Sequence, residues 1–261
     1  MDARNWIRYF ESNRGSYHEP DWSAAREIRD GRELDLLRGS LATFQLGETG
    51  EGSALRRFAG KHGGDGQFHE YARALQLFVD EEKYHAQLLA RTMYYLGGEL
   101  IEKQWTNTLF RKLRRLINLE FEIQIFITAE IIGKAYYSLL YRRVGDPVVA
   151  SVCGKLVSDE VQHLNFHIEF FRERLAGLGP LRRQLWMLQF ETIFSAARLA
   201  VWFDHGACLR AFGVSRGEFM GSTARGMRSL LARLRSTRSL VPTAFVRGPA
   251  RIIADAASLE P

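Results

Sequence analysis

Apolar residues recur along most of the chain at the spacing of one helix face, and two of these apolar stripes contain charged residues. The first stripe holds a glutamate and a histidine among apolar neighbours: Leu75, Phe78, Glu82, His85 and Leu89. The second holds a glutamate and two histidines: Cys153, Leu156, Glu160, His163 and His167. A carboxylate buried without a partner costs several kcal/mol, so each stripe predicts a buried site that neutralises its acid.

Helical patterns account for nearly the whole sequence, and no sustained alternation of apolar and polar residues indicates strands. We therefore predict an all-α fold. The pattern predicts a short amphipathic helix and linker over 1–32, two helical hairpins over 33–176, and a helical extension with a basic tail over 177–261. Within the extension, helices are expected from about 181 to 212 and from about 215 to 234.

The two stripes contain the only Glu-x-x-His tetrads of the sequence, Glu82-Lys-Tyr-His85 and Glu160-Val-Gln-His163. Residues i and i+3 of a helix project from one face, so each tetrad sets a carboxylate beside an imidazole. Each tetrad therefore offers half of a metal site. Each half needs one further carboxylate from a neighbouring helix.

Loop spacing indicates Glu130 as the partner of the second tetrad. The pair Asp146-Pro147 supplies a helix N-cap followed by proline at the first helical position. Glu160 lies about 14 residues after this cap and Glu130 about 14 residues before Val144, so an antiparallel hairpin sets the two acids at equal depth. Glu122 is the rival, but it lies two turns further from the loop.

For the first tetrad, the glycine-rich turn Gly60–Gly66 is the reference point. Asp65 is its expected N-cap, and Glu82 follows about 17 residues later. Counting a similar depth back from the turn reaches the mid-forties, where Glu48 is the nearest acid. Glu51 lies three residues closer to the turn on a similar face and remains the alternative.

These residues resemble the ferritin-like diiron-carboxylate superfamily, which includes ferritins, rubrerythrins, the ribonucleotide reductase small subunit and several oxygenases. The resemblance covers residues 33–176 and implies a ferritin-like four-helix bundle with additional N- and C-terminal helices. It also implies two bound iron ions, although a manganese–iron pair suits the same ligands. The implied metal ligands are one glutamate from each of two helices and both tetrads: Glu48, Glu82, His85, Glu130, Glu160 and His163.

The resemblance also suggests residues around the ligands. Asp159 and Glu81 precede the tetrad glutamates, and by analogy with the oxygen-activating members they would orient the metal-bound imidazoles. The alternative is that both acids lie on solvated helix faces. His167 is a candidate extra ligand or hydrogen-bonding neighbour, and Tyr137 is either a redox-active or a packed core tyrosine.

The resemblance leaves the reaction open. We expect a diiron oxidase or oxygenase that uses O2 and an external electron donor to hydroxylate, N-oxidise, desaturate or cleave a small organic substrate. The alternative is a ferroxidase or other iron-handling protein. The extension over 177–261 favours the enzyme if it walls a substrate pocket, whereas the same segment could instead form a homodimer interface.

Charge and composition narrow the partners. The chain carries a net charge of +6, and eight arginines stand against the single acid Glu218 over residues 216–251. Such a basic face favours a carrier-linked or phosphate-bearing substrate, and sparse aromatic residues there disfavour nucleic acid. The sequence begins without the apolar core of a signal peptide, its longest apolar stretch is interrupted by charges, and it has two cysteines. We therefore expect a cytoplasmic protein without a membrane span.

Overall fold

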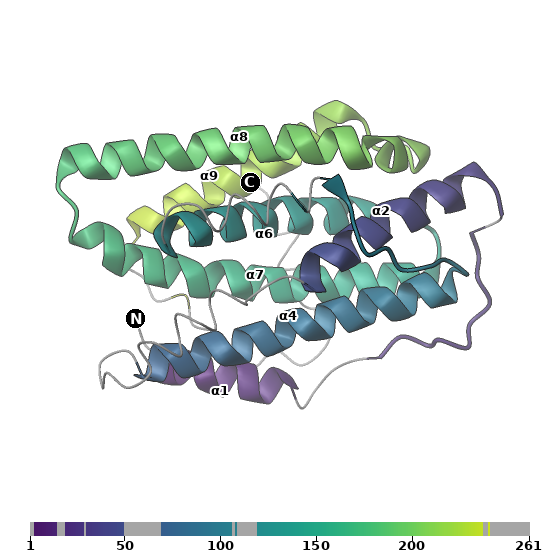
Figure 1. Ribbon diagram of the computed structural model, residues 1–261, viewed down its shortest axis with the longest axis horizontal. Helices are drawn as coiled ribbons and strands as arrows, with labels where there is room; N and C mark the ends of the chain where they lie inside the picture. Colours follow the sequence, from purple (N-terminus) through teal and green to yellow (C-terminus); the bar gives the residue numbers. More distant parts are fainter. Residues whose placement is uncertain are drawn as a thin grey trace.

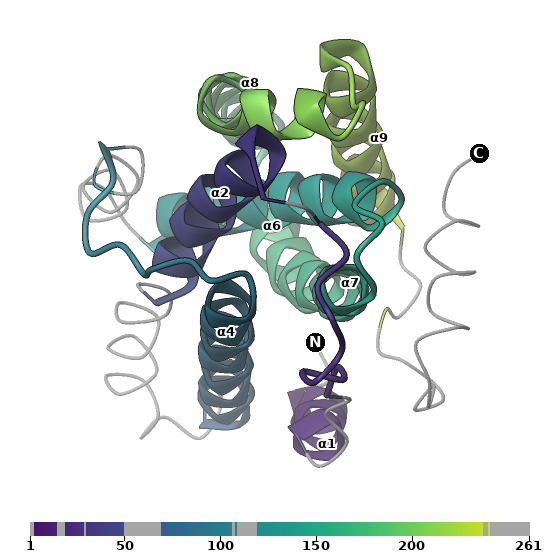
Figure 2. The same ribbon diagram turned by 90° about the vertical axis from the view of Figure 1, so that its right-hand side faces the viewer.

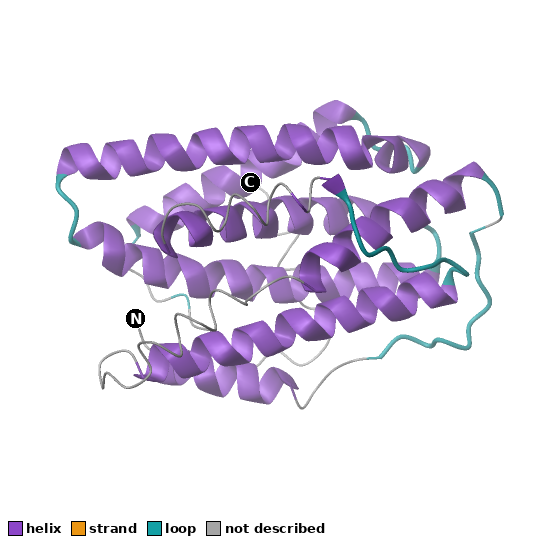
Figure 3. Ribbon diagram, in the orientation of Figure 1, coloured by secondary structure: helices purple, strands orange, loops and turns teal. Residues whose placement is uncertain are grey.

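The computed structural model describes residues 3–14, 19–28, 30–49, 69–105, 108, 119–236 and 240. Over these residues the chain is all-helical, without a strand (Figure 3). The helices, in chain order, are α1 (Ala3–Arg14), α2 (Arg32–Thr49), α4 (His69–Tyr95), α6 (Leu119–Tyr141), α7 (Pro147–Ala176), α8 (Pro180–Ala211) and α9 (Arg216–Arg235). Among the described helices, none is at once long and apolar enough to cross a membrane.

The turn between α6 and α7 has the N-cap that the sequence predicts. The Asp146 carboxylate accepts hydrogen bonds from the backbone N–H groups of Val148 and Val149, at 3.1 and 3.0 Å, and Pro147 occupies the first turn. The same carboxylate accepts the Glu27 N–H at 3.0 Å. Asp146 therefore fixes both the start of α7 and the path of the N-terminal linker.

Helices α2, α4, α6 and α7 pack around a common core, with α6 and α7 forming a long antiparallel hairpin (Figures 1 and 2). Helix α1 lies against α4 on one side of this group. Helices α8 and α9 pack against α6 on the opposite side, and α8 also reaches α2. The two predicted helices of the C-terminal extension are thus present within one or two residues of their expected bounds.

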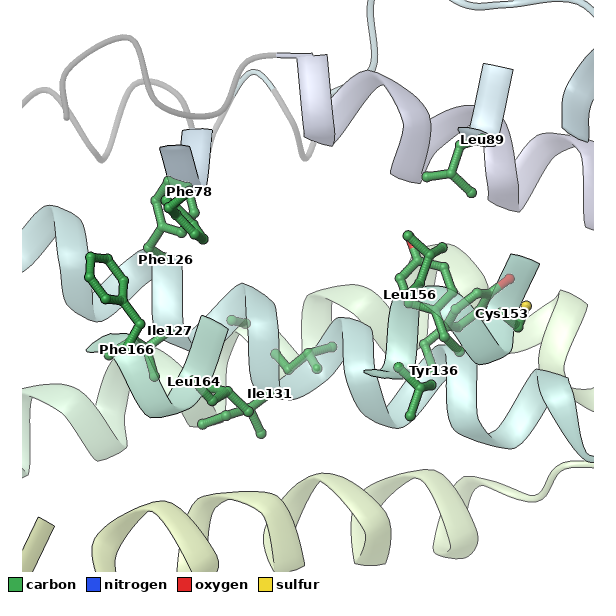
Figure 4. Packing of buried hydrophobic residues seen from close by; sticks show 14 of the residues in the cluster. Phe78, Leu89, Phe126, Ile127, Ile131, Tyr136, Cys153, Leu156, Leu164 and Phe166 are labelled. Carbon is green, nitrogen blue, oxygen red and sulfur yellow. The ribbon is translucent and has the colours of Figure 1, made fainter. Parts of the chain in front are cut away.

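The core has two apolar groups, which Figure 4 shows from close by. The first is aromatic and comes from α4, α6 and α7: Phe78, Phe126 and Phe166. The second comes from the same three helices further along: Leu89, Tyr136, Cys153 and Leu156. On α4, the tetrad Glu82–His85 falls between the two groups, and on α7 the tetrad Glu160–His163 does the same. The polar residues therefore lie midway along these packed helices, with apolar packing on both sides of them.

Helix α1 covers the aromatic group. Its Trp6 and Phe10 are buried, and both rings contact Phe166, at centroid distances of 5.5 and 5.4 Å. The Trp6 indole N–H donates to the Glu169 carboxylate of α7 at 2.9 Å. The amphipathic helix predicted for the first residues is thus present, and the structure shows that its apolar side packs on the aromatic group.

Candidate metal centre

Both tetrad histidines point one ring nitrogen into a cluster of carboxylates. His163 Nδ1 lies 2.8 Å from Glu82 Oε1, 3.3 Å from Glu160 Oε2 and 3.8 Å from Glu130 Oε2. His85 Nδ1 lies 3.8 Å from Glu160 Oε1 and 4.0 Å from Glu82 Oε2. Side chains from α4, α6 and α7 therefore converge on one buried volume.

The candidate ligand atoms form three overlapping groups, and within each group the atoms lie within 4.8 Å of one another. They are Glu82, His85 and His163; Glu82, Glu130, Glu160 and His163; and Glu48, His85 and Glu160. All six residues that the sequence indicates as metal ligands belong to at least one group. Glu48 is half-buried and the other five are buried. Glu82, His85, Glu160 and His163 each belong to two groups. Of these four, Glu82 and Glu160 have two carboxylate oxygens, so each can face two neighbouring positions.

The second ring nitrogen of each histidine is held by an acid on the other helix. His85 of α4 donates from Nε2 to Asp159 Oδ2 of α7 at 3.0 Å. His163 of α7 donates from Nε2 to Glu81 Oε2 of α4 at 2.9 Å. Because an ionised carboxylate can only accept, a proton sits on each Nε2 and Nδ1 faces the cluster, where it can offer its lone pair to a cation once it is deprotonated.

Glu81 and Asp159 are both buried, so they do not lie on solvated helix faces. Glu81 accepts a hydrogen bond from the Asn13 side chain of α1. Asp159 accepts from Lys155 Nζ, 2.6 Å from each carboxylate oxygen, and lies 3.5 Å from Asn13 Nδ2. The sequence reasoning missed Asn13 and Lys155. Lys155 is detectable as the i−4 neighbour of an acid, whereas nothing in the sequence connects Asn13 to a site so far along the chain.

The carboxylates around His163 change its protonation. Burial by itself lowers the pKa of this imidazole, but the negative charges of Glu82, Glu160 and Glu81 raise the pKa well above its ordinary value. The metal-free cluster therefore holds protons where its negative charges meet. A bound cation would take over that role and release them.

A similar balance acts on His85 and Asp159. Burial lowers the pKa of His85, but the hydrogen bond and charge of Asp159 outweigh it and the pKa is raised. Burial raises the pKa of Asp159, yet the Lys155 ammonium and His85 hold that pKa far below its usual range. Asp159 is therefore ionised and remains a pure acceptor for the imidazole.

Several buried atoms of the cluster have no hydrogen bond within the part of the chain that the structure describes. They are His85 Nδ1, His163 Nδ1, Glu130 Oε2 and Glu160 Oε2. Buried polar atoms are nearly always satisfied in native proteins, so a set of four that converge on one point calls for a further partner. Since the atoms are carboxylate oxygens and imidazole nitrogens, the buried group could hold a metal ion.

The remaining candidates occupy distinct places. Tyr137 is buried, its hydroxyl has no hydrogen bond to a described residue, and burial followed by the nearby Glu48 charge raises its pKa well above the usual value. His167 is buried but belongs to none of the three ligand groups. Glu51 lies outside the described residues, as do the turn Gly60–Gly66 and the side chain of Glu122.

His167 lies one turn beyond the ligands in the aromatic group. Its ring lies 4.8 Å from Phe78 and 5.2 Å from Phe166, centroid to centroid, and neither ring nitrogen bonds to a described residue. Burial and then the His163 charge lower its pKa to about 3. The structure thus places His167 as a neutral neighbour of the cluster rather than among its converging atoms.

Comparison with protein-family models, with curated proteins and with solved structures finds no match to this chain. The interpretation of the centre therefore depends on the residues themselves. Two features carry it, the convergence of Glu48, Glu82, His85, Glu130, Glu160 and His163 and the exchange of supporting acids between α4 and α7.

Proposed function

We propose that this chain is a ferritin-like four-helix bundle protein whose buried cluster binds two iron ions. The observation that carries the proposal is the convergence of two Glu-x-x-His tetrads with one glutamate from each of two further helices. Glu130 and His163 would hold one ion, Glu48 and His85 the other, and Glu82 and Glu160 would face both. Carboxylate and imidazole also suit manganese, so a mixed manganese–iron pair fits the same ligands.

We propose further that the protein is a non-haem diiron oxidase or oxygenase. Two iron ions, when bound and reduced by an external donor, supply the chemistry of O2 activation. The chain itself contributes orientation and exclusion of water. Asp159 and Glu81 fix both imidazoles, and the apolar groups above and below the cluster keep bulk water away. The substrate would be a small organic molecule that is hydroxylated, N-oxidised, desaturated or cleaved.

The extension beyond the bundle favours an enzyme over an iron store. Helices α8 and α9 add two long elements against α6, more than a simple storage bundle needs. The basic residues of α9 support a phosphate-bearing or carrier-linked substrate, and Arg225 and Arg228 are exposed there. Arg233 differs, because it donates to Asn165 at 2.6 Å within the protein. Arg238, Arg247 and Arg251 lie outside the described residues.

Metal content and iron loading test the proposal together. The full chain, loaded anaerobically with ferrous iron, is expected to retain two iron ions per chain by elemental analysis. Glu160→Ala should lose both, because Glu160 faces both positions, while Glu173→Ala on the exposed side of the same helix should retain both. One ion per chain in the fully loaded wild-type protein would contradict the dinuclear site.

A second measurement separates the enzyme from iron handling. On mixing with O2, an oxygenase should consume a limited amount of O2 per loaded site and leave excess ferrous iron in solution unoxidised. Catalytic oxidation of many ferrous ions per chain, with growth of a mineral core, would favour the ferroxidase alternative.

A further inference from the structure

Helix α8 has apolar residues on two opposite faces, and the other described helices cover one of them. Its inner face contacts the bundle through buried side chains: Trp186, Phe190, Phe194, Ala197 and Trp202. Its outer face carries large apolar side chains that remain exposed: Leu181 at 69%, Leu185 at 57%, Leu188 at 60%, Leu199 at 40% and Phe203 at 79%. In Figures 1 and 2, α8 forms an outer edge of the molecule, and no described helix covers this face.

The outer residues form one continuous stripe rather than scattered positions. Leu181, Leu185, Leu188, Leu199 and Phe203 follow steps of three and four residues, with the exposed Thr192 and Ala196 filling the middle of the series. This spacing is that of a helix seam that packs against another helix. A helix with apolar residues all round is normally enclosed by neighbours on every side. The stripe, defined by these seven residues, therefore has no neighbour among the described helices.

The order of residues in the stripe is symmetric about its centre. Counting outward from Thr192, Ala196 lies as far on one side as Leu188 on the other. The same holds for Leu199 and Leu185, and for Phe203 and Leu181. An antiparallel copy of the helix centred on Thr192 would therefore set large side chains against large ones at both ends, Leu188 against Ala196, and Thr192 against Thr192 at the centre. Such self-complementarity is what a twofold interface requires.

We propose that α8 forms a homodimer interface, in which the stripe of one chain packs antiparallel against the same stripe of a second copy, centred on Thr192. At roughly 150–200 Å2 for a fully exposed large apolar side chain, the five anchors expose on the order of 500 Å2. This area supplies most of the roughly 800 Å2 per partner that a stable interface buries.

Light scattering with size-exclusion chromatography tests the proposal on the full chain. The expected mass is twice the 29.9 kDa of one chain. Leu185→Lys and Leu199→Glu should each weaken the dimer at least 100-fold, whereas the double variant should recover to within about tenfold of wild type, because each lysine then faces a glutamate. Leu100→Glu is the matched control, since Leu100 is 38% exposed but lies outside the stripe. It should leave the dimer intact.

Disulfide trapping tests the register. Thr192→Cys should cross-link two chains under mild oxidation, because the two copies of this position meet at the twofold axis. Gln184→Cys should not, since its two copies lie about 24 Å apart along antiparallel helices. Cross-linking through Gln184→Cys alone would overturn the antiparallel register. A mass of one chain up to roughly 0.1 mM, or a dimer unaffected by all α8 substitutions, would overturn the interface itself.

Discussion

Two buried polar clusters of this protein each contain histidine, and their histidines are in opposite states. The metal-ligand cluster, the six residues from Glu48 to His163 defined above, contains converging atoms without hydrogen bonds to described residues. The second, here called the Ser40 network, joins α2, α6 and α8: Ser40, Tyr136, His205 and Cys208. Ser40 Oγ lies 2.6 Å from the Tyr136 hydroxyl and 2.7 Å from His205 Nδ1, and the Tyr136 hydroxyl lies 3.6 Å from Cys208 Sγ.

Their histidines differ accordingly. Burial lowers the pKa of His205 to about 4, against a weaker raising effect of Asp204, so this imidazole is neutral near pH 7. Surrounding carboxylates raise the pKa of His163 well above its ordinary value. Burial alone therefore does not mark a functional histidine. What distinguishes His163 from His205 is burial together with several atoms that lack a hydrogen bond to a described residue and converge on one point.

The largest expected difference between the clusters is in metal affinity. His163→Ala should weaken ferrous iron binding at least 100-fold, about 3 kcal/mol, because it removes one ligand from an enclosed site. His205→Ala should change the affinity less than about threefold. Competition with a chromogenic chelator under anaerobic conditions measures both, with circular dichroism to show that the helices persist. Equal losses in the two variants would remove the functional distinction between the clusters.

The free energy of unfolding should instead depend on the Ser40 network. Ser40→Ala leaves Tyr136 and His205 without their shared partner in a buried site, so the free energy of unfolding should fall by about 2–3 kcal/mol. Thr43→Ala on the same helix is the matched control, because its hydroxyl bonds only to the Gly39 carbonyl on the exposed side. Urea denaturation of the metal-free protein at neutral pH measures the two variants. A Ser40→Ala protein as stable as the Thr43→Ala protein would show that the network contributes nothing.

Sequence periodicity predicts the helices of this fold well because each buried stripe repeats at the same spacing. The tetrads bring the candidate ligands together for the same reason, since i and i+3 share a face whatever the tertiary structure. Glu130 could be predicted because Asp146 and Pro147 mark the turn from which its position along the helix is counted. These inferences all depend on local rules.

The rest of the site depends on contacts between distant helices. The exchange of partners, in which Glu81 supports His163 and Asp159 supports His85, follows from the crossing of α4 and α7 and has no local signal. The Ser40 network joins residues 165 positions apart, from Ser40 to His205. Periodicity assigned the outer leucines of α8 to the same helix as its buried residues, but only the packing shows which face is covered.

A pH dependence follows from His205. Its pKa is about 4 in the folded protein and 6.5 for the free side chain, so between these values the unfolded chain binds a proton that the folded chain does not. The contribution of neutral His205 to the free energy of unfolding is therefore fully present above pH 6.5. It is lost as the pH falls towards 4, so the free energy of unfolding drops by about 2 kcal/mol between pH 7 and 5. His205→Gln should show a correspondingly flatter profile in urea denaturation. The pKa of His167 is also lowered, but His167 is present in both the wild-type and the His205→Gln protein. Parallel pH profiles of the two proteins would therefore contradict the assignment of this pH dependence to His205.

The smallest expected effect concerns the acids that hold the imidazoles. Glu81→Gln retains an oxygen that can accept from His163 Nε2 but removes its charge, so ferrous iron affinity should fall about tenfold rather than vanish. Asp80→Asn is the matched control, since Asp80 is the preceding residue and bonds Lys83 at the half-buried side of α4. It should stay within about twofold of wild type in the same chelator competition. Because Glu81 acts across the helix pair, Asp159→Asn should reproduce the loss through His85. Equal losses from Asp80→Asn and Glu81→Gln would show that total negative charge, and not the crossed support of the imidazoles, sets the affinity.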